Sequence, residues 1–291
     1  MAELQALLNF ATADGDGTVK FILDNGWTGT NQRTELVHLH DTREHVRSLS
    51  LEREGFVLRT IESDVTDYAD AEQVDERWKP AVKRTILQAT GGSQAFLFAG
   101  PLLRFSEAHE GSRSSSVSAP ARAVHSDMAS TFRYDLFDQQ PVSEEAAREL
   151  RTLLGDREPS RWRVFNIWQM ISEPPQDCTL AICDRSSTDC ADILNGKGFY
   201  DNPAQSRDAI LAGSVAEADF DLSFFRYNPQ QKWCFFSHML PGEAMIFSAF
   251  DPQDKDGNGR VAHAAVTLPG NGAERNPRQS IEVRALVIYD D

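Results

Sequence analysis

The sequence predicts a mainly β fold with flanking α-helices, either an antiparallel β-barrel or a sandwich. Short apolar runs recur along the chain, and Asn-Pro, Pro-Gly and Gly-Asn-Gly turns separate the later ones. Only two segments have helical character. A chain of 291 residues that is 41% hydrophobic can bury a large core, so wholesale disorder is excluded.

Strands make up most of the predicted elements. In the first half they are predicted at 17–24, 34–40, 55–58 and 95–105, the last with a break at Gly100-Pro101, and at 121–124, which ends at His125. In the second half they are predicted at 161–170, 178–184, 220–227, 232–237, 244–250, 260–267 and 280–289. No internal repeat divides these strands, so one domain over residues 1–291 is expected.

Two helices and one long loop complete the predicted elements. A helix is expected from Ala69 to Ala89, kinked or divided at Pro80 and ended by Gly91-Gly92. Its apolar residues recur every fourth position: Val74, Trp78, Val82 and Ile86. A second helix is predicted over 143–154, with Ser143 as its N-cap. The polar, Ser-rich residues 106–119 predict a mobile loop, with an interdomain linker as the alternative.

Charge and composition exclude several classes of partner. The net charge of −15 repels phosphate groups, so nucleic acid and anionic membrane are not expected as partners. No apolar run approaches the ~18 residues of a spanning helix, and the N-terminus lacks the basic flank of a signal peptide. The four cysteines have no zinc-ribbon spacing, which predicts reduced, mostly buried thiols in a cytoplasmic protein.

The pair His125 and Asp127 is the sharpest chemical feature of the sequence. Residues i and i+2 of a strand share a face, so this pair can present a nitrogen and a carboxylate oxygen to one point. These are two of the three ligands of a 2-His-1-carboxylate metal site. A surface ion pair is the alternative interpretation of an isolated His-x-Asp.

The C-terminal strands supply the remaining candidates. His263 lies in a predicted strand and is the candidate third ligand, with His238 as its rival. Arg278 and Ser280 share a face at the start of the last strand, where a guanidinium and a hydroxyl can bind the distal carboxylate of a 2-oxoacid. Arg275 and Arg284 are the alternatives to Arg278.

In this order, the residues resemble the Fe(II)/2-oxoglutarate dioxygenase superfamily. Wider stretches are similar to its CmcJ/AsaB-like hydroxylase/desaturase family, which includes the cephamycin 7α-hydroxylase component and fungal meroterpenoid-pathway oxidases. The matching segments are 50–56, 120–125, 165–168, 179–184, 260–263 and 280–284, together with Trp233, Met239 and Glu243. The chain departs from the family pattern at Gln169, where Arg is expected, and at Trp78–Ala81, where Tyr-x-x-Glu is expected.

The resemblance implies a double-stranded β-helix (jelly-roll/cupin-like) barrel with an N-terminal β/α extension and lid-like insertions at about 106–119 and 130–230. It implies that Fe(II) binds to His125, Asp127 and His263, and that 2-oxoglutarate binds to Arg278 and Ser280. With dioxygen, such a site oxidises a hydrophobic small molecule of secondary metabolism by hydroxylation, desaturation, rearrangement or endoperoxide formation. The resemblance also implies that the substrate contacts Asn166, Trp168 and Trp233, and a homodimer is an additional expectation.

Other features have competing interpretations. His38, His40 and Asp41 form a second histidine-rich cluster, which is interpreted as a structural or surface feature. Residues 254–259 begin like a calcium loop but have Ala265 where a bidentate Glu is required, which predicts a turn. His109 belongs either to a lid or to a solvent loop. Phenylalanines are assigned mainly to the core: Phe224, Phe225, Phe235, Phe236 and Phe247.

Two rival functions share the same residues. One is a non-catalytic, small-molecule-binding barrel of the cupin type with its histidines in the core. The other is a hydrolase or isomerase that uses the same three ligands with Zn(II). Binding of both Fe(II) and 2-oxoglutarate distinguishes the oxygenase from these rivals.

Overall fold

The computed structural model describes most of the chain. The described residues are 4–12, 18–23, 28–29, 31–106, 117–129, 132, 148–149, 151–152, 159–200, 218, 220–254, 259–269 and 274–290. Three predictions fall largely outside them, namely the loop at 106–119 with His109, the helix at 143–154 and the turn at 254–259.

Two β-sheets make up most of the described fold. The first, sheet A, has the strand order β1 (Leu4–Ala11), β4 (Gln32–Asp41), β13 (Trp233–Phe235), β10 (Cys178–Cys183), β15 (His263–Thr267), β8 (His125–Ser126), β12 (Phe220–Phe225), β11 (Ile193–Tyr200), β2 (Thr18–Leu23) and β3 (Thr28–Gly29). The second, sheet B, has the order β5 (Phe56–Thr60), β14 (Glu243–Phe250), β9 (Trp162–Met170), β16 (Gln279–Ile288), β6 (Gln94–Phe105) and β7 (Val117–Ser118). The predicted mainly β fold is confirmed.

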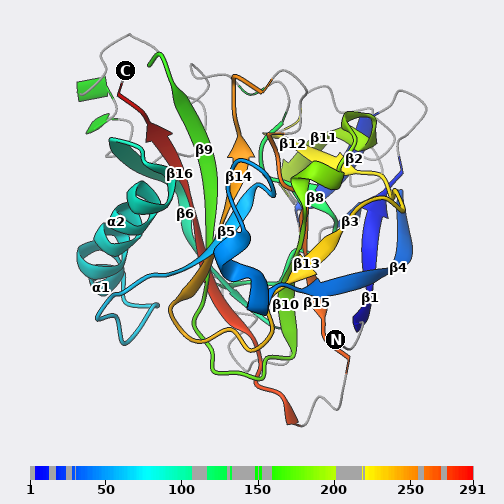
Figure 1. The fold of residues 1–291 in the computed structure, drawn as a ribbon, viewed down its shortest axis with the longest axis horizontal. Helices are drawn as coiled ribbons and strands as arrows, with labels where there is room; N and C mark the ends of the chain where they lie inside the picture. Colours follow the sequence, from blue (N-terminus) through cyan, green and yellow to red (C-terminus); the bar gives the residue numbers. More distant parts are fainter. Residues whose placement is uncertain are drawn as a thin grey trace.

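The two sheets face each other and pack through one apolar layer (Figure 1). This layer joins Phe56, Trp168 and Phe247 of sheet B to Leu180 and Ile182 of sheet A. Along the strands of sheet A, every second side chain points away from this layer, into a second core beneath β1 and β4. Neighbouring residues of one strand therefore serve different cores, so the face of a residue decides whether it can reach the site.

A helical segment covers the outer face of sheet B (Figure 1). It comprises α1 (Ala71–Gln73), one π-helical turn (Val74–Trp78) and α2 (Lys79–Thr90). Asp70 caps its N-terminus by accepting hydrogen bonds from two backbone N–H groups, and Gly91 ends it with φ of 72°. The predicted apolar stripe is buried against the sheet, and Pro80 lies in the first turn of α2, directly after the π-helical turn.

The two departures from the family pattern contact each other. The indole Nε1 of Trp78 donates a hydrogen bond of 2.6 Å to Gln169 Oε1, and Gln169 Nε2 donates one of 2.9 Å to Tyr68. Trp78 and Gln169 are both fully buried. This neutral network joins the helical segment to the central strand β9.

Five strands differ from the predictions, and two of them, β3 and β7, are two-residue strands that were not predicted. The prediction of a strand at 121–124 was wrong: these residues make one isolated bridge, between Ala123 and Asn9, and the paired strand β8 is His125–Ser126. Strands β1 and β11 were not predicted. The predicted break at Gly100-Pro101 is a bulge inside β6, because β16 pairs with residues on both sides of it.

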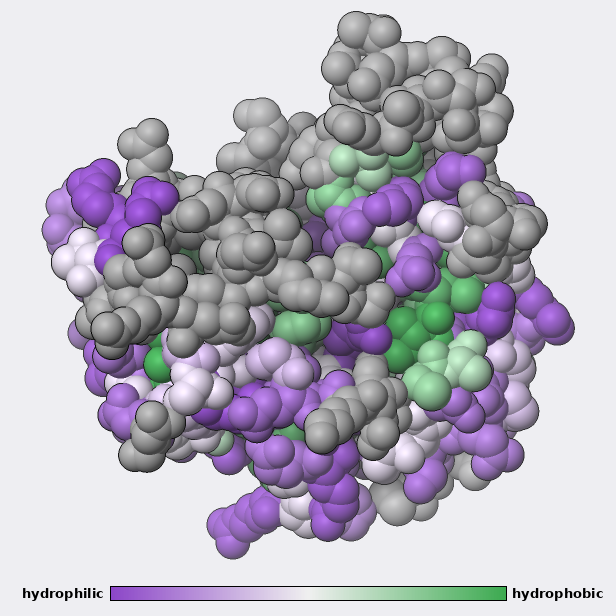
Figure 2. Space-filling view, turned by 90° about the horizontal axis from the view of Figure 1, so that it is seen from above, coloured by the Kyte–Doolittle hydropathy of each residue, from purple (hydrophilic) through white to green (hydrophobic). Residues whose placement is uncertain are grey.

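The described surface agrees with the composition. Hydrophilic side chains cover most of the described surface in the view of Figure 2, and apolar ones show between them in smaller groups. All four cysteines are free, and three of them are buried, as predicted. In the part of the chain that the structure describes, no helix is both long and apolar enough to cross a membrane.

Candidate active site

The predicted ligands meet between the two sheets. Strand β8 lies between β15 and β12, and His125 is the direct cross-strand partner of His263. The two imidazole centroids are 4.4 Å apart. Asp127 follows β8 directly, and the three side chains offer ligand atoms within 4.8 Å of one another.

The carboxylate of Asp127 bridges the two histidines. Its Oδ1 lies 3.7 Å from His125 Nε2, and its Oδ2 lies 3.7 Å from His263 Nε2. Each imidazole donates its Nδ1–H to the backbone carbonyl two residues earlier, at 2.7 Å for His125 and 3.1 Å for His263. These contacts fix the tautomer and leave each Nε2 lone pair directed to the shared centre.

The protonation states suit a divalent metal. Burial lowers the pKa of His125 to about 3, with a further contribution from His263, and burial also lowers the pKa of His263. Burial by itself raises the pKa of Asp127, but Arg284 and the two neighbouring histidines together outweigh it, and the pKa lies well below its usual range. Near neutral pH the site therefore offers two neutral imidazoles and one carboxylate, the donor set of a 2-His-1-carboxylate metal centre.

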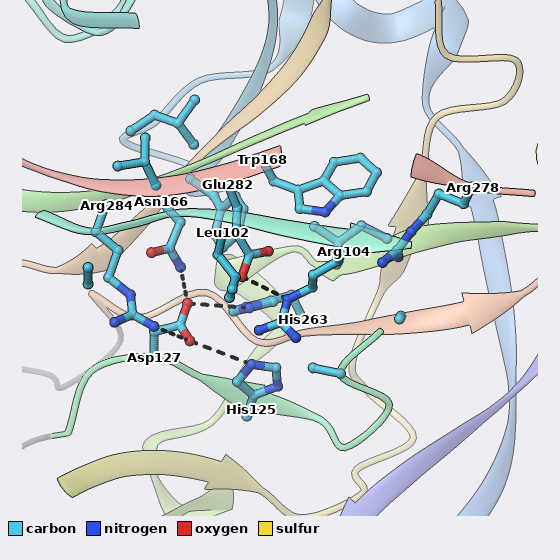
Figure 3. Close-up of a pocket in the computed structure, with 17 residues that line it drawn as sticks. Leu102, Arg104, His125, Asp127, Asn166, Trp168, His263, Arg278, Glu282 and Arg284 are labelled. Carbon is cyan, nitrogen blue, oxygen red and sulfur yellow. Dashed lines mark hydrogen bonds and ion pairs between the residues drawn. The ribbon is translucent and has the colours of Figure 1, made fainter. Parts of the chain in front are cut away.

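Two residues of sheet B hold the carboxylate of Asp127. Arg284 Nη2 lies 2.7 Å from Oδ1, and Asn166 Nδ2 donates a hydrogen bond of 2.8 Å to Oδ2. Arg284 on β16 is the direct cross-strand partner of Asn166 on β9. Figure 3 shows both side chains directed at Asp127. The sheet opposite the histidines thus holds the carboxylate of the third predicted ligand in place.

The triad lies at one end of a pocket whose walls are mainly apolar. Its apolar lining residues are Ala99, Leu102, Ala121, Ile167, Trp168, Leu180, Phe247, Ala265 and Val283. Arg104 and Glu282 also line it and form an ion pair of 2.8 Å. Arg278 lies at the opposite side of the pocket from Asp127 (Figure 3).

The guanidinium of Arg278 is buried without an anionic partner among the described residues. Arg278 is 1% exposed, and its Nε and Nη2 have no hydrogen-bond partner. Nη1 contacts only the thiol of Cys178, at 3.7 Å, and the guanidinium lies 5.5 Å from the centre of the Trp168 ring. Burial lowers the pKa of Arg278. Because an uncompensated buried charge costs several kcal/mol, this geometry fits a site for an anionic ligand.

The other predicted site residues are placed differently. Ser280 is buried, but its hydroxyl donates to the carbonyl of Arg104 at 3.2 Å, and it does not line the pocket. Asn166 and Trp168 do line it. Trp233, also expected to contact the substrate, is not among the residues that line this pocket: its side chain faces the second core, where its ring meets Phe10 edge-on. Spacing alone does not reveal which face of β13 a residue occupies.

The rival ligands lie outside the site. His238 is exposed in a turn, and His38 and His40 are exposed on β4. Within the described residues, His125, Asp127 and His263 form the one cluster of side chains that could hold a metal ion. The phenylalanines assigned to the core are buried, and Phe247 also lines the pocket and contacts the ring of His263 edge-on at 4.7 Å.

The sequence did not reveal the contact between Arg284 and Asp127. Arg284 lies six residues after Arg278, on the strand face expected for that residue, so the sequence offers it only as an alternative anion-binding arginine. The ion pair between Arg104 and Glu282 could not be predicted from the sequence, because the two residues lie on strands far apart along the chain. Their pairing follows from the register of β6 against β16.

Comparison with known proteins places the chain among related enzymes. A family model described as "Oxidoreductase/YMDC permease-like domain" matches residues 8–288. The chain is 27% identical over 301 residues to the alpha-ketoglutarate-dependent dioxygenase phiK of Fungal sp. (strain ATCC 74256), covering 98% of this chain and 96% of that protein. It is 32% identical over 134 residues to the hydroxylase/desaturase asaB of Aspergillus flavus, covering 45% of this chain and 57% of asaB.

A solved structure has the same fold. The iron and alpha-ketoglutarate-dependent endoperoxidase NvfI superposes with a TM-score of 0.74 and 22% sequence identity, covering 99% of each chain. This similarity confirms the predicted jelly-roll barrel.

Proposed function

The chain belongs to the oxidoreductase/YMDC permease-like domain family, and on this premise we propose that His125, Asp127 and His263 bind the iron of an oxygenase. It is an Fe(II)/2-oxoglutarate-dependent dioxygenase, in agreement with the relatives that match along nearly its whole length. Its cofactors are Fe(II), 2-oxoglutarate and dioxygen. The single observation that carries the assignment of ligands is the convergence of two neutral imidazoles and one carboxylate.

Arg278 is the proposed anchor for the distal carboxylate of 2-oxoglutarate. Its buried, unpartnered guanidinium supports this role, because a carboxylate accepts two parallel hydrogen bonds from such a group. Arg284 is already paired with Asp127, which argues against it as the anchor. Ser280 is proposed as the second anchor, through reorientation of its hydroxyl from the carbonyl of Arg104.

The substrate is a small molecule, and we propose that it is largely apolar and belongs to secondary metabolism. The apolar walls of the pocket support this class. Asn166 Oδ1 is buried without a hydrogen-bond partner in the described structure and lies on the pocket wall. We propose that it accepts a hydrogen bond from a hydroxyl or N–H group of the substrate, and that Trp168 packs against the adjoining part of the pocket.

The residues of this chain orient the reactants and exclude water. Bound iron supplies the oxidising chemistry, which couples decarboxylation of 2-oxoglutarate to succinate with oxidation of the substrate. Arg278 fixes one end of the diacid, while Phe247 and Leu180 shield the ligands from solvent. Hydroxylation, desaturation and endoperoxide formation differ in where the pocket holds the reacting C–H bond.

An anaerobic titration with Fe(II) and 2-oxoglutarate tests the proposal. The complex is expected to show the weak visible charge-transfer band of an iron-bound 2-oxoacid. His263→Ala should bind no stoichiometric iron and give no band. His238→Ala is the matched control, because this imidazole is exposed outside the site. Arg278→Met should retain iron but require about 10- to 100-fold more 2-oxoglutarate, since it lacks a charge-assisted contact of roughly 1.5–3 kcal/mol.

Two results would overturn the assignment. Absence of the band in the wild-type protein with iron bound would favour a metal-binding barrel without oxygenase chemistry. Loss of iron in His238→Ala, with iron retained in His263→Ala, would replace the third ligand.

A further inference from the structure

We propose that Arg284 and Asn166 are positioning residues that fix the carboxylate of Asp127 and thereby set the affinity and geometry of the metal site. This inference rests on the proposed function, since it presumes a metal at the triad. Asp127 is only weakly attached to its own strand. Strand β8 has two residues, and Asp127 lies just beyond it.

The two histidines, unlike Asp127, are held by their own strands and backbone. His263 begins β15, which pairs over five positions with β10, and His125 lies within β8. Their Nδ1–H groups are also tied to backbone carbonyls. Among the residues that the structure describes, Asp127 has no comparable restraint from sheet A, and apart from the histidines its carboxylate contacts Arg284 and Asn166 of sheet B.

Each of these contacts restrains a different oxygen. Arg284 Nη2 engages Oδ1 at 2.7 Å, and Asn166 Nδ2 engages Oδ2 at 2.8 Å. With one oxygen held at each end, the carboxylate plane cannot rotate, and Oδ1 and Oδ2 each stay opposite one histidine. Partners of this kind, which touch a metal ligand and not the metal, typically change metal affinity 10- to 100-fold.

The backbone around Arg284 is shaped for this contact. On β6, residues 99–101 lie opposite the single residue Val283, between the pairs Leu102–Glu282 and Phe98–Arg284. Ala99 has φ of 49°, in the left-handed region that disfavours side chains, and it lines the pocket beside Arg284. Bulges next to active sites commonly redirect a side chain, and this one lies at the residue pair that presents Arg284.

Cobalt(II) binding tests the inference without turnover. Co(II) substitutes for Fe(II) in a nitrogen and carboxylate site, and its visible ligand-field spectrum reports coordination geometry. Arg284→Met should weaken Co(II) binding about 10- to 100-fold and shift the spectrum. Arg284→Lys, which keeps the charge, should recover most of the affinity. Asn166→Leu, which has a similar volume and no N–H group, should weaken binding in the same direction.

Arg161→Met is the matched control. Arg161 has 26% side-chain exposure, against 25% for Arg284, and it forms an ion pair with Asp251 away from the pocket. Loss of that pair should lower the melting temperature and leave Co(II) affinity and spectrum unchanged. Circular dichroism identifies any unfolded variant, and in that case Arg284→Lys and Asn166→Leu carry the test.

The outcomes separate the two proposals. If the wild-type protein binds no Co(II) at the triad, the proposed metal site is wrong. If it binds Co(II) and the folded Arg284 and Asn166 variants bind with unchanged affinity and spectrum, the positioning role is wrong. An equal loss of affinity in Arg161→Met would also contradict the inference, because the effect would then reflect general destabilisation.

Discussion

His125 and His263 are buried imidazoles that the fold keeps neutral. Burial lowers the pKa of His125 to about 3, and that of His263 is lowered for the same reason. In the unfolded chain an imidazole titrates near 6.5. Between these values the unfolded state binds protons that the folded state does not, so lowering the pH favours unfolding of the metal-free protein.

The first prediction concerns this pH dependence. Above about pH 7, protonation of His125 should make no contribution to the free energy of unfolding of the metal-free protein. As the pH falls through 6.5, this free energy should decrease by up to about 1.4 kcal/mol per pH unit for each histidine. Urea denaturation between pH 5 and pH 7 measures it. His125→Gln should have a shallower pH dependence than the wild-type protein. Identical slopes for the wild type and His125→Gln would show that His125 does not titrate this way.

At the residue scale, the sequence predicted the residues that converge but not their partners. The order of His125, Asp127 and His263 predicted a metal-binding set, and the structure brings these three side chains together. The face of Trp233 could not be predicted, because it depends on the register of the short strand β13. The partner of Arg284 could not be predicted either, because Asp127 reaches it from the opposite sheet.

The bulge in β6 requires glycine at position 100. A Cβ atom on Gly100 would lie 2.8 Å from the carbonyl oxygen of Glu282 and 3.1 Å from the Cα of Val283. Both are backbone atoms of β16, which also presents Arg284 to the site. The strand cannot relieve this contact without moving.

Gly100→Ala should therefore destabilise the protein by about 1–3 kcal/mol, the usual cost of overpacking, and also weaken Co(II) binding. Gly91→Ala is the comparison, since its φ of 72° is strained for alanine but no atom lies within 4 Å of the added Cβ. It should cost about 1–2 kcal/mol and leave Co(II) affinity unchanged. Thermal melts and Co(II) titrations measure both effects. Equal Co(II) affinity in the two variants would disconnect the bulge from the site.

At the element scale, most strands and the helical segment were predictable, whereas two long strands, β1 and β11, and the two-residue strands β3 and β7 were not. Strand β1 has buried Ala6, Leu8 and Phe10 in alternation, but its alanines and leucines are also good helix formers. Strand β11 contains Gly196 and Gly198, which suggest a turn. In the structure the Phe224 ring lies close against Gly196, so a glycine fits there because of cross-strand packing.

Both sheets draw strands from the two halves of the chain. In sheet A, β4 pairs with β13, and in sheet B, β5 pairs with β14. The last strand, β16, lies between β9 and β6. No single cut through the sequence separates the described strands into two independent groups, so one domain is the expected folding unit.

We predict that the metal-free protein unfolds in one cooperative transition. Far-ultraviolet circular dichroism reports the strands of both sheets. Tryptophan fluorescence reports the apolar cores, through Trp233 in the core beneath β1 and β4, Trp168 between the sheets and Trp78 in the helical segment that packs on sheet B. The two signals should have the same urea midpoint. Separate midpoints would indicate that the sheets unfold independently and would contradict the single domain.

At the scale of the whole molecule, turn chemistry and short apolar runs were sufficient to predict a mainly β fold, whereas strand order was not predictable. The pairing of β8 with β15, which places His125 opposite His263, joins residues far apart in the chain. Such pairings depend on the total packing of the two sheets. Only the resemblance to a known family anticipated them.

Asp127 is attached to the sheet opposite its two histidine partners. The geometry of the site therefore depends on the distance between the two sheets. A substitution in the interior, even one remote from the pocket, that spreads the layers by a fraction of an ångström would draw the carboxylate away from the imidazoles while the backbone stays intact. Metal retention would then decline well before the melting temperature does. In a screen for stabilised variants of this enzyme, metal content would therefore be a more sensitive measurement than thermal stability.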